Sequence, residues 1–405
     1  MEENEEIEVL EDEPNLKISD IVKSPNVAEM LSDEQLATIG NRVYDDWQID
    51  QSSRSEWEER TADAMRLALQ VMEEKTFPWE NASNVKFPLV TIAALQYQAR
   101  AYPALIPDVN IVKARVLGID ETGAKQARAD RVSSYMSFQI LEEDECWEEN
   151  MDRALIAQAI VGCAFKKSYF DTALGHNVSE HVLAKDLYIP YFAKSLEKAS
   201  RITQMLYLSS NDLLQKQRSG LYCETKVAIQ PEVPVSTPLT AAVEEAQGVT
   251  APSNDTSTPY EVLEQHRYLD LDDDEYEEPY IVTIRKDTKQ VLRIVARFSS
   301  TSIKKNSKKE ITYIAPDHFF TKFAFIPSPD GGIYDLGFGV LLGPLNESIN
   351  TILNQLVDAG TLSNTAGGFL GRGVKFRSGD NSFKPFEWKR VDSTGDDLRK
   401  GIFPL

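Results

Sequence analysis

Residues 325–371 read FIPSPDGGIYDLGFGVLLGPLNESINTILNQLVDAGTLSNTAGGFLG. A glycine-punctuated loop leads into one amphipathic helix, and a second glycine-rich turn follows it. Asn346, Asn350 and Asn354 recur every four residues, so they line up on one side of this helix. A broad apolar stripe occupies another side. We therefore expect the helix to stand among copies of itself. We also expect Asn350→Leu or Asn354→Leu to spare folding and impair assembly.

The ends of this helix are marked by glycine and proline. We expect the helix from Pro344 to Gly360, within a segment at 336–361, with Pro344 in its first turn, where a missing N–H costs nothing. Gly360 is expected to end it in a left-handed conformation. Between Pro344 and Gly360 there is no Lys or Arg, and the acids are Glu347 and Asp358. The tight turns on either side are assigned to Gly337, Gly339, Gly367 and Gly368.

A buried core helix is the alternative interpretation. It explains the apolar stripe equally well, but it explains the asparagine row less well, because a buried Asn needs hydrogen-bond partners. The stripe consists of Leu345, Ile349, Ile352, Leu353, Leu356 and Val357.

The overall charge argues against a general nucleic-acid binder. The 405 residues carry 64 acids against 43 Lys and Arg, a formal net charge of −21. A protein that grips DNA normally carries a basic excess. Contact with DNA would therefore need a local basic patch, or a channel that encloses DNA without holding it.

Cysteine usage and hydropathy argue against a disulfide-rich or zinc-binding protein and against a membrane-spanning one. Cys146, Cys163 and Cys223 are widely spaced, which fits neither a disulfide framework nor a zinc site. The acidic N-terminus lacks the basic residues of a signal peptide. The longest nearly apolar run, 154–165, is shorter than the roughly 20 residues that span a bilayer. We therefore expect no membrane insertion.

Helical spacing of apolar residues dominates the first part of the chain. Ser32 is a good N-cap for a long charged helix expected to reach about Glu74, with Trp47 and Trp57 as its anchors. Further helices are expected over 86–102, 120–142 and 146–161, the first of them ended by Pro103.

Strand patterns follow near residue 164. Alternating residues predict strands at 164–171, 187–192, 222–229, 280–285 and 290–298, with an earlier strand at 110–117. A short helix capped by Asn211 is expected to end near Gly220. The order of elements favours an α+β fold over a doubly wound parallel sheet.

The expected organisation has five parts. They are an acidic flexible arm (1–35), a helical region (36–163), a β-rich region (164–335) with a flexible insertion at 230–259, the helix (336–361) and a terminal region (362–405).

One acidic motif suggests metal chemistry. Asp270, Asp272 and Asp274 form D-x-D-x-D, as in a calcium loop. The sixth position, which should be Gly, is Glu275, and the twelfth, which should be Glu, is Ile281. The motif is therefore interpreted as a solvated acidic turn, and a metal-dependent enzyme that uses 270–274 stays an alternative hypothesis.

Other motifs of catalysis or cofactor binding fail on spacing. The glycines after 337 do not match a dinucleotide loop, and those after 367 lack the Gly-Lys-Ser/Thr of a phosphate loop. The four His residues are scattered and include no HExxH pair. We therefore predict no enzyme activity, no cofactor and no metal.

The net charge of the chain changes from negative to positive after the helix. Residues 361–405 hold eight bases and five acids, a net charge of +3. The bases singled out as an exposed patch are Arg372, Lys375, Arg377, Lys384, Lys389 and Arg390.

Four collinear stretches resemble the portal proteins, or head-to-tail connectors, of tailed phages, most closely those of short-tailed phages. They are WENASN (79–84), YFAKSLEKASRITQMLY (191–207), EPYIV (278–282) and the whole of 325–389. The resemblance covers roughly residues 40–405 and implies a wing (36–335), a first stem helix (336–361) and a partial β-containing clip (362–405). Stem and channel positions would be Asn346, Glu347, Asn350, Asn354 and Asp358.

The resemblance also implies a function and partners. Portal subunits form a ring, usually a homododecamer, at one capsid vertex, through which double-stranded DNA is packaged and ejected. The implied partners are the terminase motor, head–tail adaptor and tail proteins, and capsid and scaffolding proteins. The implied location is the virion, with the host cytoplasm during assembly.

One departure from the family is plain. Its members continue past the clip into a second stem helix, a tunnel loop and a crown, whereas this sequence stops at 402–405. We therefore expect a C-terminally incomplete subunit. Another structural or scaffolding protein of the virion stays an alternative.

Overall fold

The computed structural model describes residues 17–72, 82–107, 110–172, 174–224, 231, 233, 236–252, 255, 257–272, 274–308, 310–364, 368–370 and 402–404. Helices and antiparallel sheets are both extensive in this part of the chain, which confirms the α+β class. The helices are α1 (Ile18–Ile21), α2 (Asp33–Ser53), α3 (Ser55–Leu69), α4 (Leu89–Leu105), α5 (Ala124–Phe138), α6 (Trp147–Val161), α7 (Ser210–Arg218), α8 (Pro238–Gln247) and α9 (Phe338–Asn364). Short 3-10 or π turns lie at Val27–Met30, Gln139–Glu143, Ala184–Asp186 and Ser300–Ser302.

A five-stranded antiparallel sheet forms the largest layer, in the order β3-β4-β5-β6-β7. Its strands are β3 (Leu187–Tyr188), β4 (Arg201–Leu208), β5 (Tyr260–Leu269), β6 (Glu278–Arg285) and β7 (Val291–Ala296). Successive side chains of a strand point to opposite faces. Accordingly Leu263 packs with Val43 and Trp47 of α2, whereas Val262 packs with Leu213 of α7 on the other face.

A second sheet of three strands lies beside α6, in the order β10-β1-β2. It consists of β1 (Cys163–Asp171), β2 (His176–Val182) and β10 (Phe320–Ala324), and Phe165 at its centre is fully buried. Two short pairs complete the strands: β8 (Ile303–Lys305) with β9 (Ile311–Ile314), and β11 (Gly368–Leu370) with β12 (Ile402–Pro404).

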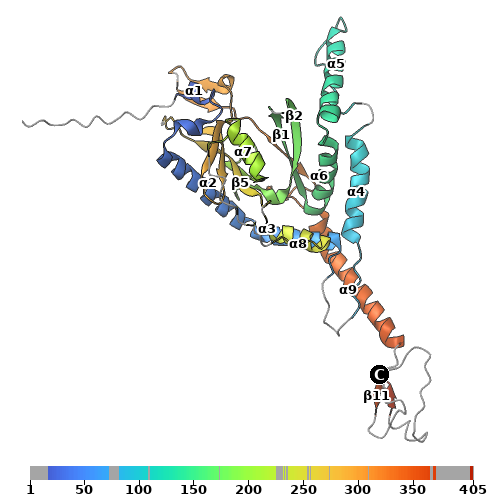
Figure 1. Ribbon diagram of the computed structural model, residues 1–405. Coiled ribbons are helices and arrows are strands. Elements are labelled where there is room, and N and C mark those ends of the chain that lie inside the picture. Colours follow the sequence, from blue (N-terminus) through green and yellow to red (C-terminus); the bar gives the residue numbers. More distant parts are fainter. Residues whose placement is uncertain are drawn as a thin grey trace, which may run out of the picture.

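Helix α9 leaves this body and points away from both sheets (Figure 1). Its first turns pack against α3, α4 and α6. The pair β11–β12 lies beyond its far end (Figure 1). The described residues thus form a body, a projecting helix and a small strand pair.

The helices of the first part lie where the spacing predicts, and both tryptophan anchors are buried. Three boundaries differ, and the first is the end of α3, which lies at Leu69 and not near Glu74. The long helix divides at Arg54 into α2 and α3, and α4 continues past Pro103 to Leu105. Pro103 removes the hydrogen bond that an N–H at this position would donate to the carbonyl four residues earlier, and α4 ends two residues later.

The N-terminal arm is ordered from residue 17, which corrects its predicted extent. Ile21 and Val27 are fully buried against the five-stranded sheet. Asn26 ties this segment to β7, because its side-chain oxygen accepts from the Ile294 N–H and its amide donates to the Leu292 carbonyl. The prediction for residues 1–16 lies outside the described residues.

The insertion 230–259 contains helix α8, which overturns its interpretation as wholly flexible. Thr237 caps the helix and Pro238 occupies its first position, both of them ordinary start signals. Leu239 and Ala242 are buried, and α8 packs on α3. Helix α8 has ten residues and buries only two of them, so its apolar spacing is too short to predict a helix within this stretch.

Three predicted strands need correction. Residues 110–117 form no strand, and of 187–192 only Leu187–Tyr188 is paired. Residues 221–224 are not strand either, and 225–229 lie outside the described residues. The segment at Val112 is extended, but its backbone bonds with the side chains of Ser133 and Ser137 on α5 instead of with another strand.

Candidate functional site

The start of helix α9 is held by close backbone contacts. A Cβ on Gly337 would lie 2.3 Å from the Ile160 carbonyl oxygen, and one on Gly339 would lie 2.3 Å from Ala64 Cβ. These two glycines therefore let α9 approach α6 and α3 closely. Gly337 directly precedes the helix, whereas Gly339 lies inside it, so the assignment of Gly339 to a turn is wrong.

Two predictions for the limits of this helix are wrong. Pro344 lies inside α9, six residues after its first residue, and Gly360 lies inside it with four helical residues still to follow. Gly360 does not have the positive φ of a left-handed stop. The helix continues because 361–364 add another helical turn, so Gly360 is an interior glycine.

The asparagine row binds the extended segment 83–89. Backbone N–H groups of alternate residues in that segment donate to side-chain oxygens that recur every four residues on α9. Leu89 donates to Asn346 at 3.0 Å, Phe87 to Asn350 at 2.7 Å, Val85 to Asn354 at 2.6 Å and Ser83 to Asp358 at 2.8 Å.

The match depends on two repeats of nearly equal length. Four helical residues advance about 6.0 Å along the axis, and two extended residues advance about 6.6 Å. The segment runs antiparallel to α9, so its repeat stays in step with the row over four bonds. All four row side chains are consequently buried, at 8% exposure or less.

Asn354 makes the most contacts in the row. Its oxygen also accepts from the Ser83 hydroxyl at 3.1 Å, and its amide donates to the Val85 carbonyl at 3.2 Å. Asn350 accepts only the Phe87 N–H among the bonds recorded for it. The asparagines therefore differ in whether their amide nitrogen is used.

This arrangement corrects the interpretation of the row as a face toward copies or a channel. Four of the five stem positions are buried and bound within the subunit, and only Glu347 is exposed. Asn350→Leu and Asn354→Leu each remove the acceptor of a backbone N–H. We therefore expect both variants to be less stable, and not to spare folding.

The uncovered side of α9 is apolar. Exposure reaches 45% at Leu341, 54% at Leu345, 56% at Ile352 and 65% at Leu356, and Ile349 lies between them half-buried. Steps of four, four, three and four residues put all five on one side of a helix. We call this set the apolar stripe. Compared with the stripe expected from the sequence, it adds Leu341 and leaves out Leu353, which is half-buried, and Val357, which is exposed on another side.

The acidic turn after β5 is predicted to be solvated, but of the three aspartates in its D-x-D-x-D motif only Asp274 is exposed. Asp274 accepts from the Tyr276 N–H at 2.9 Å and does not join the group of carboxylates that approach one another. Asp270 and Asp272 instead meet Glu278, the first residue of β6, and the three carboxylates have oxygens within 4.8 Å of one another. Sequence spacing missed Glu278 because the hairpin, not the loop, brings it to the site.

Burial changes the acidity of this cluster. It raises the pKa of Glu278 to about 8, with the charges of Asp272 and Asp274 adding to the effect. The pKa of Asp272 is also raised, first by burial and then by Asp274 and Asp270. The cluster is a group of closely spaced carboxylates, which is unlike the fully solvated turn expected.

Some predicted residues are not placed. Gly367 and the six basic candidates (Arg372, Lys375, Arg377, Lys384, Lys389 and Arg390) lie outside the described residues. Gly368 is described, as the first residue of β11, where it pairs with Pro404.

Comparisons with known proteins add no assignment. The sequence matches no protein-family model, and it matches none of the curated proteins. Within the described part of the chain, no helix is both long enough and apolar enough to cross a lipid bilayer.

Proposed function

We propose that this chain is a subunit of a phage portal, which forms a ring at one capsid vertex and passes double-stranded DNA during packaging and ejection. In this proposal the body is the wing, α9 is the first stem helix and the β11–β12 region belongs to the clip. The protein acts by ring geometry and not by catalysis.

The apolar stripe is the observation that carries the proposal. Five apolar residues on one side of a projecting helix cover about 22 Å of its length, at a rise of 1.5 Å per residue. Four of the five are exposed in the described part of the chain, and Ile349 is half-buried. Exposed apolar patches of this kind mark interaction surfaces. In a ring of identical subunits, each stripe would pack against the α9 of a neighbour.

The asparagine row supports the same arrangement in a different way. It fastens the segment 83–89 along α9 and so makes the projecting helix one thicker, stiffer unit. A helix that must keep its position in a ring benefits from such support, because fewer conformations are lost on assembly.

The charge of α9 suits a channel through which DNA moves. Its charged residues are Glu347 and Asp358, with no Lys or Arg. A wall without cations neutralises no phosphates and therefore does not hold DNA. The docking of the terminase motor, adaptor and tail proteins is proposed for the clip region.

Electron microscopy of a purified full-length version of the protein at increasing concentration tests the proposal. We expect closed rings with a single rotational symmetry, as in a portal dodecamer. Particles that stay monomeric at the highest concentration, or that form open filaments, contradict it.

The apolar stripe would also suit a second class of protein, another self-assembling component of the virion. Copy number distinguishes the two. Quantitative mass spectrometry of particles should find one ring of this chain per particle for a portal, and a much larger number for a shell or scaffolding protein.

A further inference from the structure

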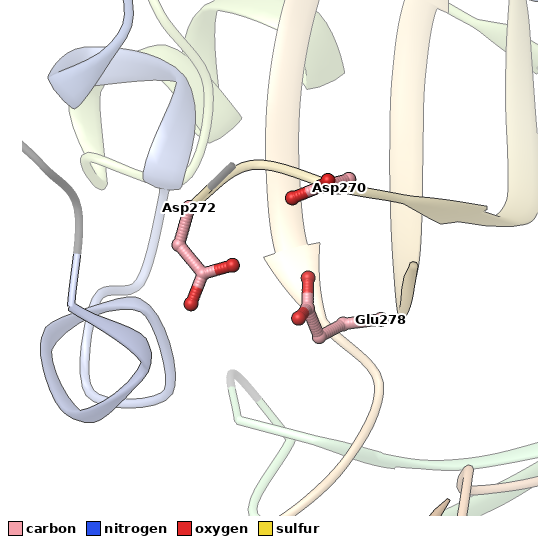
Figure 2. A group of neighbouring side chains, drawn as sticks. All are labelled: Asp270, Asp272 and Glu278. Carbon is pink, nitrogen blue, oxygen red and sulfur yellow. The ribbon is translucent and has the colours of Figure 1, made fainter. Parts of the chain in front are cut away.

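The end of the β5–β6 hairpin brings three carboxylates together. Leu269 pairs with Glu278 across the two strands, so the loop between them folds back on its own start. Asp270, Asp272 and Glu278 turn their carboxylates toward one another (Figure 2), and one oxygen of each lies within 4.8 Å of the others.

Glu278 is fully buried and points into this cluster. Its Oε2 accepts from the Tyr280 hydroxyl at 3.3 Å, but its Oε1 has no hydrogen-bond partner among the described residues. The Oδ1 atoms of Asp270 and Asp272 are likewise buried without a partner there. Each carboxylate therefore presents one desolvated oxygen, which costs free energy unless something positive binds it.

No side chain supplies that positive charge within the described residues. None of the ion pairs recorded there includes Asp270, Asp272 or Glu278.

We propose that Asp270, Asp272 and Glu278 bind a calcium ion. Calcium takes oxygen ligands at about 2.3–2.6 Å in adaptable geometry. Ligands on opposite sides of such an ion are therefore about 4.8 Å apart, and adjacent ligands are closer. The spacing of the three oxygens fits this limit. Magnesium fits less well, because it requires a near-ideal octahedron and keeps most of its waters.

The ion would fasten the loop to the core of the body. Leu271, between two of the ligands, packs against the core cluster that contains Ile21, Val27 and Tyr280. Bound calcium would therefore stabilise the contact between the N-terminal segment and the five-stranded sheet. This inference does not depend on the proposed function.

Calorimetric titration of the EDTA-treated 405-residue chain with calcium chloride tests the proposal. We expect one ion per chain with a dissociation constant below about 1 mM, weaker binding of magnesium, and a higher thermal midpoint with calcium. Terbium should bind at the same place and show luminescence sensitised by Tyr280, which calcium then displaces.

Three variants distinguish calcium binding at this site from nonspecific calcium binding to the acidic surface of the protein. Glu278→Gln should weaken calcium binding roughly ten-fold or more, because one charged ligand is lost. Asp272→Asn, at a half-buried position, should do the same and guards against a folding defect in the first variant. The matched control is Glu277→Gln, an exposed neighbour, which should leave the affinity unchanged.

Three results overturn the proposal. One is an absence of saturable binding by the wild-type chain. Another is equal binding by wild type, Glu278→Gln and Asp272→Asn when all keep their circular dichroism spectra. The third is binding of magnesium or manganese in preference to calcium.

Discussion

At the scale of single residues, the asparagine row shows how a helix can hold an extended chain. Each row side chain accepts one backbone N–H from a segment that has no strand beside it. The periodicity of Asn346, Asn350 and Asn354 could be read from the sequence. Their partner could not, because the segment 83–89 lies more than 250 positions away, and the apolar spacing assigns its second half to the helix predicted over 86–102.

Asn350 and Asn354 should respond differently to the same substitutions. Asn350→Leu leaves the Phe87 N–H without its acceptor and should lower the free energy of unfolding by roughly 1–2 kcal/mol. Asn350→Asp keeps the acceptor, as Asp358 does naturally, and should lose less. Asn354→Asp also loses the donor to the Val85 carbonyl and should be the more damaging of the two Asp variants.

Urea unfolding followed by circular dichroism measures these differences. Thr351→Leu, at an exposed neighbouring position, is the control for adding a leucine to α9. Equal stability of Asn350→Leu and wild type would contradict the role assigned to the row.

At the scale of elements, long periodic helices and hairpins were predictable from the sequence, and segments that pair with side chains were not. Helices α5 and α6 and the hairpin β6–β7 lie close to their predicted positions, because each has a regular apolar spacing. Helix α6 and the hairpin bury these residues, whereas α5 leaves Val132, Tyr135 and Met136 exposed. The extended segment at Val112 alternates like a strand, yet it binds serine hydroxyls of α5. Alternation alone does not identify the partner of an extended chain.

The glycines of α9 give a prediction at this scale, because two of them have opposite surroundings. Gly339→Ala should destabilise the protein by roughly 1–3 kcal/mol, since its Cβ would overlap Ala64 of α3. Gly360→Ala meets nothing within 4 Å and should stabilise the helix by about 0.5–1 kcal/mol.

Thermal unfolding of the two alanine variants beside wild type measures both effects. A lower midpoint for Gly360→Ala would mean that this residue ends the helix after all. An unchanged midpoint for Gly339→Ala would contradict the close packing of α9 against α3.

At the scale of the whole molecule, α9 separates two kinds of surface. The polar row binds the chain's own segment 83–89, and most of the apolar stripe is exposed. Sequence periodicity identified both sides of the helix but assigned the asparagines to the neighbouring copy. The assignment failed because the burial of a row depends on which distant segment reaches it, and composition does not show that.

The central claim is that the apolar stripe joins subunits into a ring. The most direct measurement is the mass distribution of the assembled protein by sedimentation velocity, for wild type and for Leu345→Ser, Ile352→Ser and Leu356→Ser combined. Gln355→Ala, an exposed polar position on the same helix, is the control. We predict that wild type and the control form one large closed species, and that the triple variant stays a folded monomer. Assembly of the triple variant to the wild-type mass, or a monomeric wild type at high concentration, would contradict the claim.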